Sequence, residues 1–265
     1  MPELRTLLWS ILLLLVSASH SLGQLSPSPF QNIHGAIVRG DTSARELALV
    51  FTGDEYADGG MHIARVLEHQ GIKGSFFLTG KFYRNPNFKS VLDALVSGGH
   101  YLGAHSDQHL LYCDWEMRDS LLLTRGEFIE DLENNYRVMQ DFGIEKEDAL
   151  LFLPPYEWYN DSIAAWTTSM GLQLINFTHG TLSHADYTLP GSSGYRTTQD
   201  IYSSILAYET AHSTGLNGFI LLSHIGTAAE RSDKFYFRLE ELISELRSKG
   251  YRFFRIDELL QAKAN

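Results

Sequence analysis

Short runs of apolar and β-branched residues alternate with stretches of helical periodicity along most of the chain. The runs have strand length and predict seven strands, at Leu47–Thr52, Ser75–Thr79, Tyr101–Ala104, Ala149–Leu153, Leu172–Phe177, Gly218–Ser223 and Tyr251–Ile256. Between most of them, apolar residues recur at the three- and four-residue spacing that turns one face of a helix toward a core. The pattern therefore predicts strands and helices in alternation.

Three of the helical stretches are especially regular. They read MHIARVLEHQG, EFIEDLENNYRVMQDFG and RLEELISELRSKG, and they end at Gly71, Gly143 and Gly250. A glycine just past the last turn is a common helix end, because glycine adopts the left-handed conformation without steric cost. We expect each of these helices to stop at its glycine.

Seven strands that alternate with helices indicate a parallel sheet, and that number suits a distorted, nearly closed (β/α)7 barrel. An open doubly wound sheet is the alternative. The segment FTGDEYADGG after the first strand lacks the glycine spacing of nucleotide-binding folds, which counts against the nucleotide-binding form of that alternative. The polar segment from Gln24 to about Glu46 is interpreted as a connector.

The charge balance excludes one class of partner. The chain has 21 Lys and Arg against 32 Asp and Glu, a net charge of −11. An acidic surface repels phosphate backbones, so we do not expect the protein to bind nucleic acid. Apolar residues make up 44% of the chain and charged residues 20%, an ordinary composition for a globular domain.

Residues 1–23 have the order of a secretory signal peptide. Arg5 precedes the apolar run Leu7–Val16, and the small residues of Ser17–Gly23 follow. The run is too short to cross a bilayer, which takes about 20 residues, and an uncleaved anchor is the alternative. We expect one domain over 24–265, secreted or periplasmic, without a membrane span after leader removal, and from a bacterium.

The cysteine count bears on how the domain is stabilised. Cys113 is the only cysteine, so the chain cannot form an internal disulfide, and its stability must come from a sizeable core. Cys113 itself is expected to be a buried packing residue. Glycosylation sequons begin at Asn160 and Asn176, and they matter only in a eukaryotic secretory pathway.

Residues that could carry chemistry follow the predicted strands. In strand order they are Asp54, Glu55, His105, His109, Tyr156, Glu157, Asp186 and His224. In a β/α barrel the carboxyl ends of the strands meet at one face, and the reactive groups lie there. The sequence therefore predicts that these residues share one end of the barrel.

His105 and His109 lie four residues apart where the third strand ends. In a chain with 11 His such a pair can arise by chance, and a hydrogen-bonded pair at the edge of a core is the alternative. A zinc site needs two or three imidazoles and a carboxylate about 2 Å from the ion. Asp54 and Glu55 supply carboxylates at the end of the first strand, so the sequence predicts a divalent metal, most readily zinc.

Four short motifs resemble those of a known family. They read HSDQH, FLPPYEW, ADY and LLSHIG, and with the chain around them, about residues 47–257, they are similar to the polysaccharide deacetylases, carbohydrate esterase family 4, with a NodB-like catalytic domain. The resemblance implies the distorted barrel of that family. It also implies a metal-dependent hydrolase that removes N-acetyl or O-acetyl groups from an oligo- or polysaccharide.

The resemblance implies roles for individual residues. Asp54, His105 and His109 would hold the metal, which would lower the pKa of bound water and polarise the acetyl carbonyl. The Tyr156 backbone N–H would stabilise the oxyanion, and His224 would protonate the leaving amine or alcohol.

Asp186 could orient the His224 imidazole and keep it protonated, as an opposite charge does. The alternatives are a core histidine bonded to a backbone carbonyl for His224 and a turn residue for Asp186.

The first motif departs from the family pattern. The family reads Thr-Phe-Asp-Asp-Gly, with its base before its metal ligand, whereas this chain reads VFTGDEYADGG. One inserted residue aligns Asp54 with the ligand and Gly53 with the base. A match without the insertion would place Thr52 and Gly53 at the positions of the base and the metal ligand, and these two residues cannot together bind a metal ion. Leu153 also replaces the arginine that steadies the family's base.

Because the base and its partner arginine are both absent from their places, another carboxylate is expected to act as the base. Glu55, adjacent to Asp54, is favoured over Glu157 at the end of the fourth strand, and either could be a solvated loop residue.

Aromatic residues near these loops suit a glycan groove, because sugar faces are apolar and stack on rings. They are Tyr112, Trp115, Trp158, Tyr159 and Tyr187, each of which could instead belong to the core. Three functions are therefore considered. The first is a secreted carbohydrate deacetylase, the second a metal-retaining carbohydrate-binding pseudoenzyme, and the third a related metal amidohydrolase of a small non-sugar amide.

Overall fold

The computed structural model describes residues 29–261, so the leader predicted at 1–23 lies outside the described residues. One nine-stranded sheet runs through this part of the chain. Its last seven strands are β3 Glu46–Gly53, β4 Ser75–Leu78, β5 Tyr101–Ala104, β6 Leu151–Phe152, β7 Gln173–Leu174, β8 Phe219–His224 and β9 Arg252–Phe254. Each overlaps one predicted strand, and the α/β fold class is confirmed.

The sheet curls into a distorted barrel. Its order is β1-β2-β8-β3-β4-β5-β6-β7, and β9 pairs with the start of β3. The pairings of β3 with β4, β8 and β9, and those of β4 to β7 in succession, are all parallel. A bridge between Ile37 of β2 and Ile175, just after β7, brings the two ends of the sheet order together. The curl gathers the carboxyl ends of the strands at one mouth.

The segment from Gln24 to Glu46 is more than the connector that the sequence indicated, so that expectation is wrong for its central part. Strands β1 Gln31–Ile33 and β2 Ala36–Arg39 form an antiparallel hairpin, and β2 pairs with β8. The apolar part of β2 spans only three residues, too short for a periodic signal. Its burial depends on contacts with a strand that lies far along the chain.

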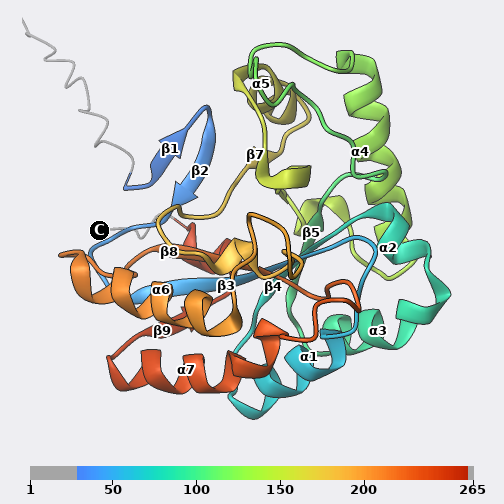
Figure 1. The fold of residues 1–265 in the computed structure, drawn as a ribbon. Coiled ribbons are helices and arrows are strands. Elements are labelled where there is room, and N and C mark those ends of the chain that lie inside the picture. Colours follow the sequence, from blue (N-terminus) through green and yellow to red (C-terminus); the bar gives the residue numbers. More distant parts are fainter. Residues whose placement is uncertain (1–28, 262–265) are drawn as a thin grey trace, which may run out of the picture.

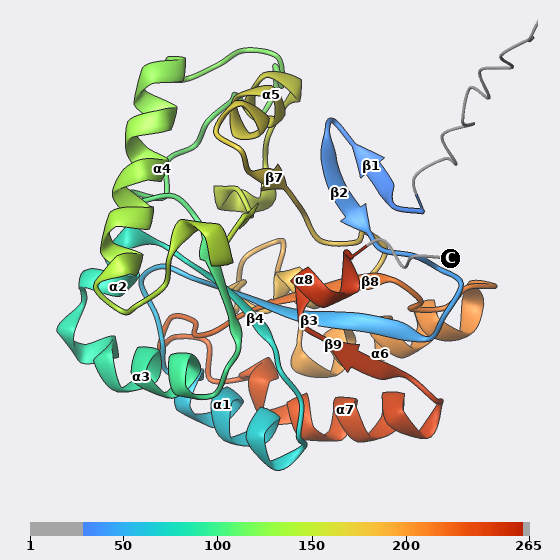
Figure 2. The same cartoon turned by 180° about the vertical axis from the view of Figure 1, so that it is seen from behind.

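Helices surround the sheet, as Figure 1 and Figure 2 show from opposite sides. They are α1 Gly60–His69, α2 Gly80–Arg84, α3 Lys89–Ser97, α4 Arg125–Gln140, α5 Asp161–Ser169, α6 Thr198–Ala211, α7 Leu239–Ser248 and α8 Ile256–Leu259. Helices α1, α4 and α7 correspond to the three regular stretches. Gly71, Gly143 and Gly250 follow their ends with φ of 61°, 75° and 87°, which confirms the predicted stops.

Two apolar clusters lie on the two faces of the curled sheet. The outer cluster packs the sheet against the helices, and the inner one fills the barrel with residues that lie on the strands or directly after them. On β3, Ala48 and Val50 belong to the inner cluster, whereas Leu49 and Phe51 belong to the outer cluster. This alternation sets the direction of the residues that follow on the same strand.

The inner cluster fits closely around one glycine. A Cβ added to Gly103 of β5 would lie 2.4 Å from the Phe77 ring, so only glycine leaves room for that ring. Helix α8 closes the amino-terminal end of the barrel with Ile256 and Leu259. The polar residues of the site are therefore confined to the opposite mouth.

Burial settles two smaller expectations. Cys113 is fully buried, as predicted, and burial raises the pKa of its thiol. Asn160 and Asn176 are 2% exposed and engaged in hydrogen bonds, so neither sequon is accessible in the fold. Within residues 29–261 no helix is long and apolar enough to cross a membrane.

Candidate active site

The loop that carries the two histidines is held by helix α4. The backbone N–H of His105 donates to Asn135 Oδ1 at 2.9 Å, and that of Gln108 donates to Asp131 Oδ1 at 3.0 Å. The hydroxyl of Tyr112 donates to the same carboxylate at 2.9 Å. These bonds fix the loop from beneath, on its buried side.

The same loop has an unusual backbone. Ser106 and His109 have φ of 75° and 57°, in the left-handed region that non-glycine residues seldom adopt. The Ser106 hydroxyl accepts the N–H of His109 at 2.9 Å, which stabilises the tight turn between the two histidines.

Asp131 and Asn135 were not among the predicted site residues, although the sequence carries a signal for them. They lie four residues apart on the buried face of α4, beside Phe128, Leu132 and Tyr136. Polar residues on the apolar face of an amphipathic helix require hydrogen-bond partners. Their position could have marked this face of α4 as the support of a functional loop.

His105 presents one nitrogen to a ligand. Its Nδ1 lies 2.7 Å from the carbonyl oxygen of Leu153. A carbonyl only accepts, so Nδ1 carries the proton and Nε2 keeps a lone pair, as in metal-bound histidines. Burial, together with the nearby His109, keeps the pKa of His105 well below its usual value. Burial also lowers the pKa of His109 to about 4, so both imidazoles are neutral at pH 7.

The spacing of the two imidazoles suits a shared ion. Their ring centroids are 5.2 Å apart. Two imidazoles on one tetrahedral zinc ion, each with a bond of about 2 Å, have ring centres about 5 Å apart. In chemistry and spacing, His105 and His109 therefore fit a divalent cation.

Asp54 is engaged elsewhere in this arrangement. It accepts a hydrogen bond from the Thr79 hydroxyl at 2.8 Å, and its other oxygen lies 3.0 Å from Lys81 Nζ. Among the described residues, no three His, Cys, Asp or Glu side chains stand close enough together to hold a metal ion. The three-residue ligand set stays a prediction, in which Asp54 would have to share its carboxylate with Lys81 or release it.

His224 and Asp186 lie in direct contact. Nδ1 of His224 is 2.6 Å from Asp186 Oδ1, and the His224 backbone N–H donates to Asp186 Oδ2 at 2.9 Å. Burial alone would lower the pKa of His224, but the negative charges of Asp186 and Glu157 raise it above its ordinary value. The pair can therefore hold a proton on the imidazole near neutral pH.

Glu157 lies on a strained turn after β6. Tyr156 and Glu157 both have left-handed backbones, with φ of 59° and 54°. Asn176 Nδ2 donates to the Glu157 carbonyl at 2.8 Å and holds the turn in place. Burial raises the pKa of the Glu157 carboxyl to about 7, against the opposing charge of His224 and with the added repulsion of Asp186.

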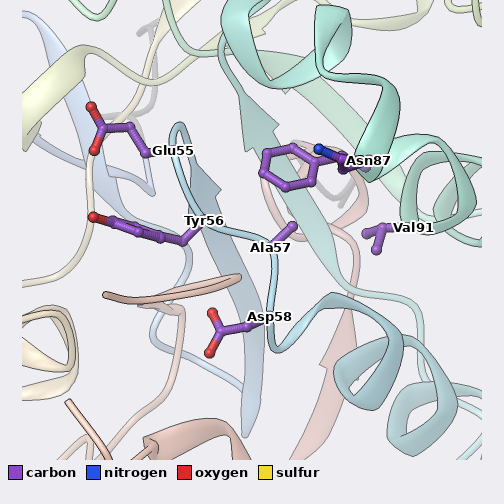
Figure 3. Close-up of a pocket in the computed structure, with 7 residues that line it drawn as sticks. Glu55, Tyr56, Ala57, Asp58, Asn87 and Val91 are labelled. Carbon is purple, nitrogen blue, oxygen red and sulfur yellow. The ribbon is translucent and has the colours of Figure 1, made fainter. Parts of the chain in front are cut away.

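Glu55 has a different setting. It is exposed and lines a cavity of about 360 Å³ together with Asp58, Asn87 and Val91. Figure 3 shows its carboxylate projecting from the loop after β3, away from Asn87 and Val91. The carboxylates whose charges raise the pKa of His224 most are instead those of Asp186 and Glu157.

The packing at the end of β3 leaves no room for a side chain at Gly53, the position that the sequence aligned with the base. A Cβ at Gly53 would lie 2.6 Å from Ile225 Cγ2 and 2.8 Å from Leu78 Cδ2, both of which belong to the outer cluster. A side chain there would point away from the barrel interior. By the alternation of β3, the inward position next to it is Thr52.

The predicted aromatic set divides into core and surface. Tyr112 and Tyr159 are buried, whereas Trp115 and Tyr187 are 53% and 54% exposed. Trp158 is half-buried beneath Trp115, with ring centroids 5.4 Å apart.

The exposed rings line the mouth beside the histidines. Tyr156, 45% exposed, lies 4.4 Å from the His109 ring and 5.6 Å from that of Trp115. Tyr187 lies 4.9 Å from the His224 ring. Aromatic surface therefore lies beside both His109 and His224.

Comparisons with known proteins identify the family and the fold. Residues 39–175 match the family described as polysaccharide deacetylase. The chain is 22% identical over 231 residues to the peptidoglycan-N-acetylmuramic acid deacetylase PdaA of Bacillus subtilis, over 87% of this chain and 77% of the relative. The solved structure of PdaA, a family 4 carbohydrate esterase, superposes with a TM-score of 0.66 at 19% identity over 85% of each chain.

Two further solved structures share the fold. The chitin deacetylase of the fungus Colletotrichum lindemuthianum has a TM-score of 0.66 at 18% identity, over 89% of this chain and 96% of its own. BA3943 of Bacillus anthracis, a family 4 pseudoenzyme, has a TM-score of 0.65 at 17% identity, over 87% and 70%. The matched segment spans half of the sequence, and this chain therefore belongs to the polysaccharide deacetylase family.

Proposed function

We propose that the protein is a secreted, metal-dependent deacetylase that hydrolyses N-acetyl or O-acetyl groups on a glycan. The observation that carries the proposal is that a candidate base and a candidate acid both titrate near neutral pH at the same mouth of the barrel. Glu157 has a raised pKa of about 7, and His224, bonded to Asp186, has a pKa raised above its ordinary value. A base and an acid poised near neutrality suit hydrolysis of an acetyl group.

Glu157 is proposed as the base in preference to Glu55. Its carboxyl and the His224 imidazole shift each other's pKa, which supports a place for both at the same site. Glu55 is exposed beside another cavity. The choice made from sequence, which favoured Glu55 because it adjoins Asp54, is therefore reversed in this proposal.

The reaction proposed for these residues balances its protons. Water gives a proton to Glu157, and its oxygen bonds to the acetyl carbonyl carbon. The carbon–nitrogen or carbon–oxygen bond to the sugar then breaks, and His224 protonates the departing atom. The products are acetic acid, which ionises, and a free amine or hydroxyl, and the proton on Glu157 returns to His224.

Backbone and metal would stabilise the developing charge. The N–H of Tyr156 has no protein acceptor within residues 29–261, which leaves it available for the oxyanion. A divalent cation held by His105, His109 and Asp54, most readily zinc, would polarise the acetyl carbonyl and lower the pKa of water when bound.

The open aromatic mouth supports a glycan rather than a small amide. Tyr156, Trp115 and Tyr187 expose aromatic surface beside His109 and His224. A closed pocket would have suited the amidohydrolase alternative. PdaA and the chitin deacetylase act, by their names, on N-acetylated glycans, which makes peptidoglycan and chitin fragments the first substrates to try.

The test is acetate release from a panel of acetylated glycans by the zinc-loaded protein. We expect release by the wild type, a fall of about 100-fold or more in Glu157→Gln and His224→Ala, and near-normal rates in Glu55→Gln. Zinc-loaded protein that binds the glycans without releasing acetate would instead identify a carbohydrate-binding pseudoenzyme.

A further inference from the structure

Thr52 has a hydroxyl that the fold leaves unpartnered. The residue is 2% exposed, and its Oγ1 has no hydrogen-bond partner within the described chain. Buried hydroxyls are nearly always bonded, because an unpaired one costs free energy. Valine has almost the same shape and high strand propensity, so packing does not require a hydroxyl at this position.

The hydroxyl lies on the inner side of the barrel at the site mouth. Ala48 and Val50, four and two residues before it on β3, both belong to the inner cluster. Thr52 is in register with His224 on the neighbouring parallel strand β8, so the two residues stand side by side on adjacent strands. Outward-pointing Gly53 separates Thr52 from Asp54.

Polar groups near Thr52 can supply the further hydrogen bonds that a bound water molecule needs. A buried water needs two to four polar partners, and a hydroxyl offers one donor and two acceptor sites. On the neighbouring strand, His224 uses Nδ1 for Asp186 and leaves Nε2 for another contact. The charge of Glu157, at the end of the turn after β6, acts on the same imidazole.

We propose that Thr52 is a positioning residue whose hydroxyl holds, beside His224, the water molecule that Glu157 deprotonates. This inference rests on the deacetylase function proposed above. It assigns a role at the inward position of the divergent first motif, where no carboxylate is available, and it explains why a polar residue follows Ala48 and Val50 on the inner side of β3.

The test compares Thr52→Val, which removes only the hydroxyl, with Thr52→Ser, which keeps it. We expect Thr52→Val to lower kcat by about tenfold or more with KM unchanged, because a misplaced nucleophile slows the chemical step. Thr52→Ser should stay within about twofold of the wild type. Thr52→Val should fold like the wild type, because valine has almost the same shape and a high strand propensity.

A matched control checks the substitution itself. Thr167 is also buried, but its hydroxyl donates to the Ile163 carbonyl in α5 at 2.8 Å, so it already has a partner within its own helix. Thr167→Val should lose stability and keep kcat. If Thr52→Val has normal kcat, or if Thr52→Ser loses as much as Thr52→Val, the positioning role is overturned.

A crystal structure of the wild type gives a readout that does not depend on turnover. It should show an ordered water within about 3 Å of Thr52 Oγ1, and that water should be missing in Thr52→Val. An empty position overturns the proposal even if the protein releases acetate. Should the water be present in a protein that releases no acetate, the deacetylase function fails and the water loses its assigned part as nucleophile.

Discussion

Two adjacent residues at the site concentrate backbone strain. Tyr156 and Glu157 both adopt left-handed conformations, and each such non-glycine residue costs on the order of 1–3 kcal/mol. The surrounding fold opposes this cost through the hydrogen bond from Asn176, which is almost fully buried. Strain of this kind persists where it serves a purpose. Here it gives Glu157 its partly buried setting, where the charge of His224 acts on its carboxyl.

The mutual influence of three charges predicts a pH profile. A base must be deprotonated and an acid protonated, so kcat should rise as pH passes the pKa of Glu157, about 7, and fall as it passes that of His224. Asp186 raises both values. Asp186→Asn should therefore move both limbs of the profile to lower pH.

This shift is measured by kcat between pH 5 and 10 for the wild type and Asp186→Asn, with Asp93→Asn as control. Asp93 pairs with Lys89 on the surface of α3, so its loss should leave both limbs in place. Limbs that stay fixed in Asp186→Asn would show that the carboxylate does not tune either group.

The ion pair at Asp54 predicts how metal affinity responds to one substitution. The Lys81 ammonium neutralises a proposed ligand and repels an incoming cation, and it also lowers the pKa of His109. Lys81→Met should bind zinc about tenfold or more tightly, because Asp54 is then free and the repulsion is gone. The pKa of His109 would rise from about 4 but should stay below 7, so protons should not compete at neutral pH.

Calorimetric titration with zinc measures this effect, and Lys81→Arg, which keeps the charge, is the control. Equal affinities in Lys81→Met and the wild type would mean that Asp54 takes no part in holding the ion.

At the scale of elements, helix α4 links the core to the site. Its apolar side packs in the outer cluster, while Asp131 and Asn135 bond the loop of the two histidines. Asn135 also donates to the carbonyl of Leu78 at the end of β4, so one side chain joins three elements. The histidine loop therefore depends on the position of this helix.

Removal of that side chain should weaken both fold and site. Asn135→Ala leaves the buried His105 N–H and the Leu78 carbonyl without partners. This should lower the free energy of unfolding, measured by urea denaturation, by about 1–3 kcal/mol. Zinc affinity should fall as well, because the loop loses its support. The neighbouring Asn134→Ala, on the more exposed side of α4, should change stability by less than about 0.5 kcal/mol. Equal losses in the two variants would contradict this account.

The elements also show what can be predicted from sequence. Seven strands and three helices were located because their apolar residues repeat with a clear period and glycines close the helices. The hairpin of β1 and β2 was missed because its burial arises from pairing with β8, a partner about 180 residues away in the chain. Local patterns do not contain that information.

At the scale of the whole molecule, barrel topology carries most of the site prediction. Parallel strands bring their carboxyl ends to one mouth, so the candidate residues could be named from strand ends alone. The proposed base, Glu157, could not be identified in this way. Its position depends on the left-handed backbones of Tyr156 and Glu157 after β6, which no local sequence pattern specifies. The direction of Thr52 and the pairing of Asp54 with Lys81 likewise follow from packing between distant segments.

The shape of the mouth makes a final prediction about substrate length. Trp115 is exposed and joined to His109 through the Tyr156 ring, so it lies one ring beyond the reacting groups. A sugar residue that stacks there must belong to a chain. Trp115→Ala should therefore raise KM for acetylated oligosaccharides about tenfold, equivalent to the 1–1.5 kcal/mol of an aromatic contact, and leave kcat and the KM of a monosaccharide unchanged. Trp166→Ala, which removes a ring that packs on Phe128 in the outer cluster, should instead lower stability without this dependence on length. Equal changes in KM for short and long substrates would place Trp115 outside the binding surface.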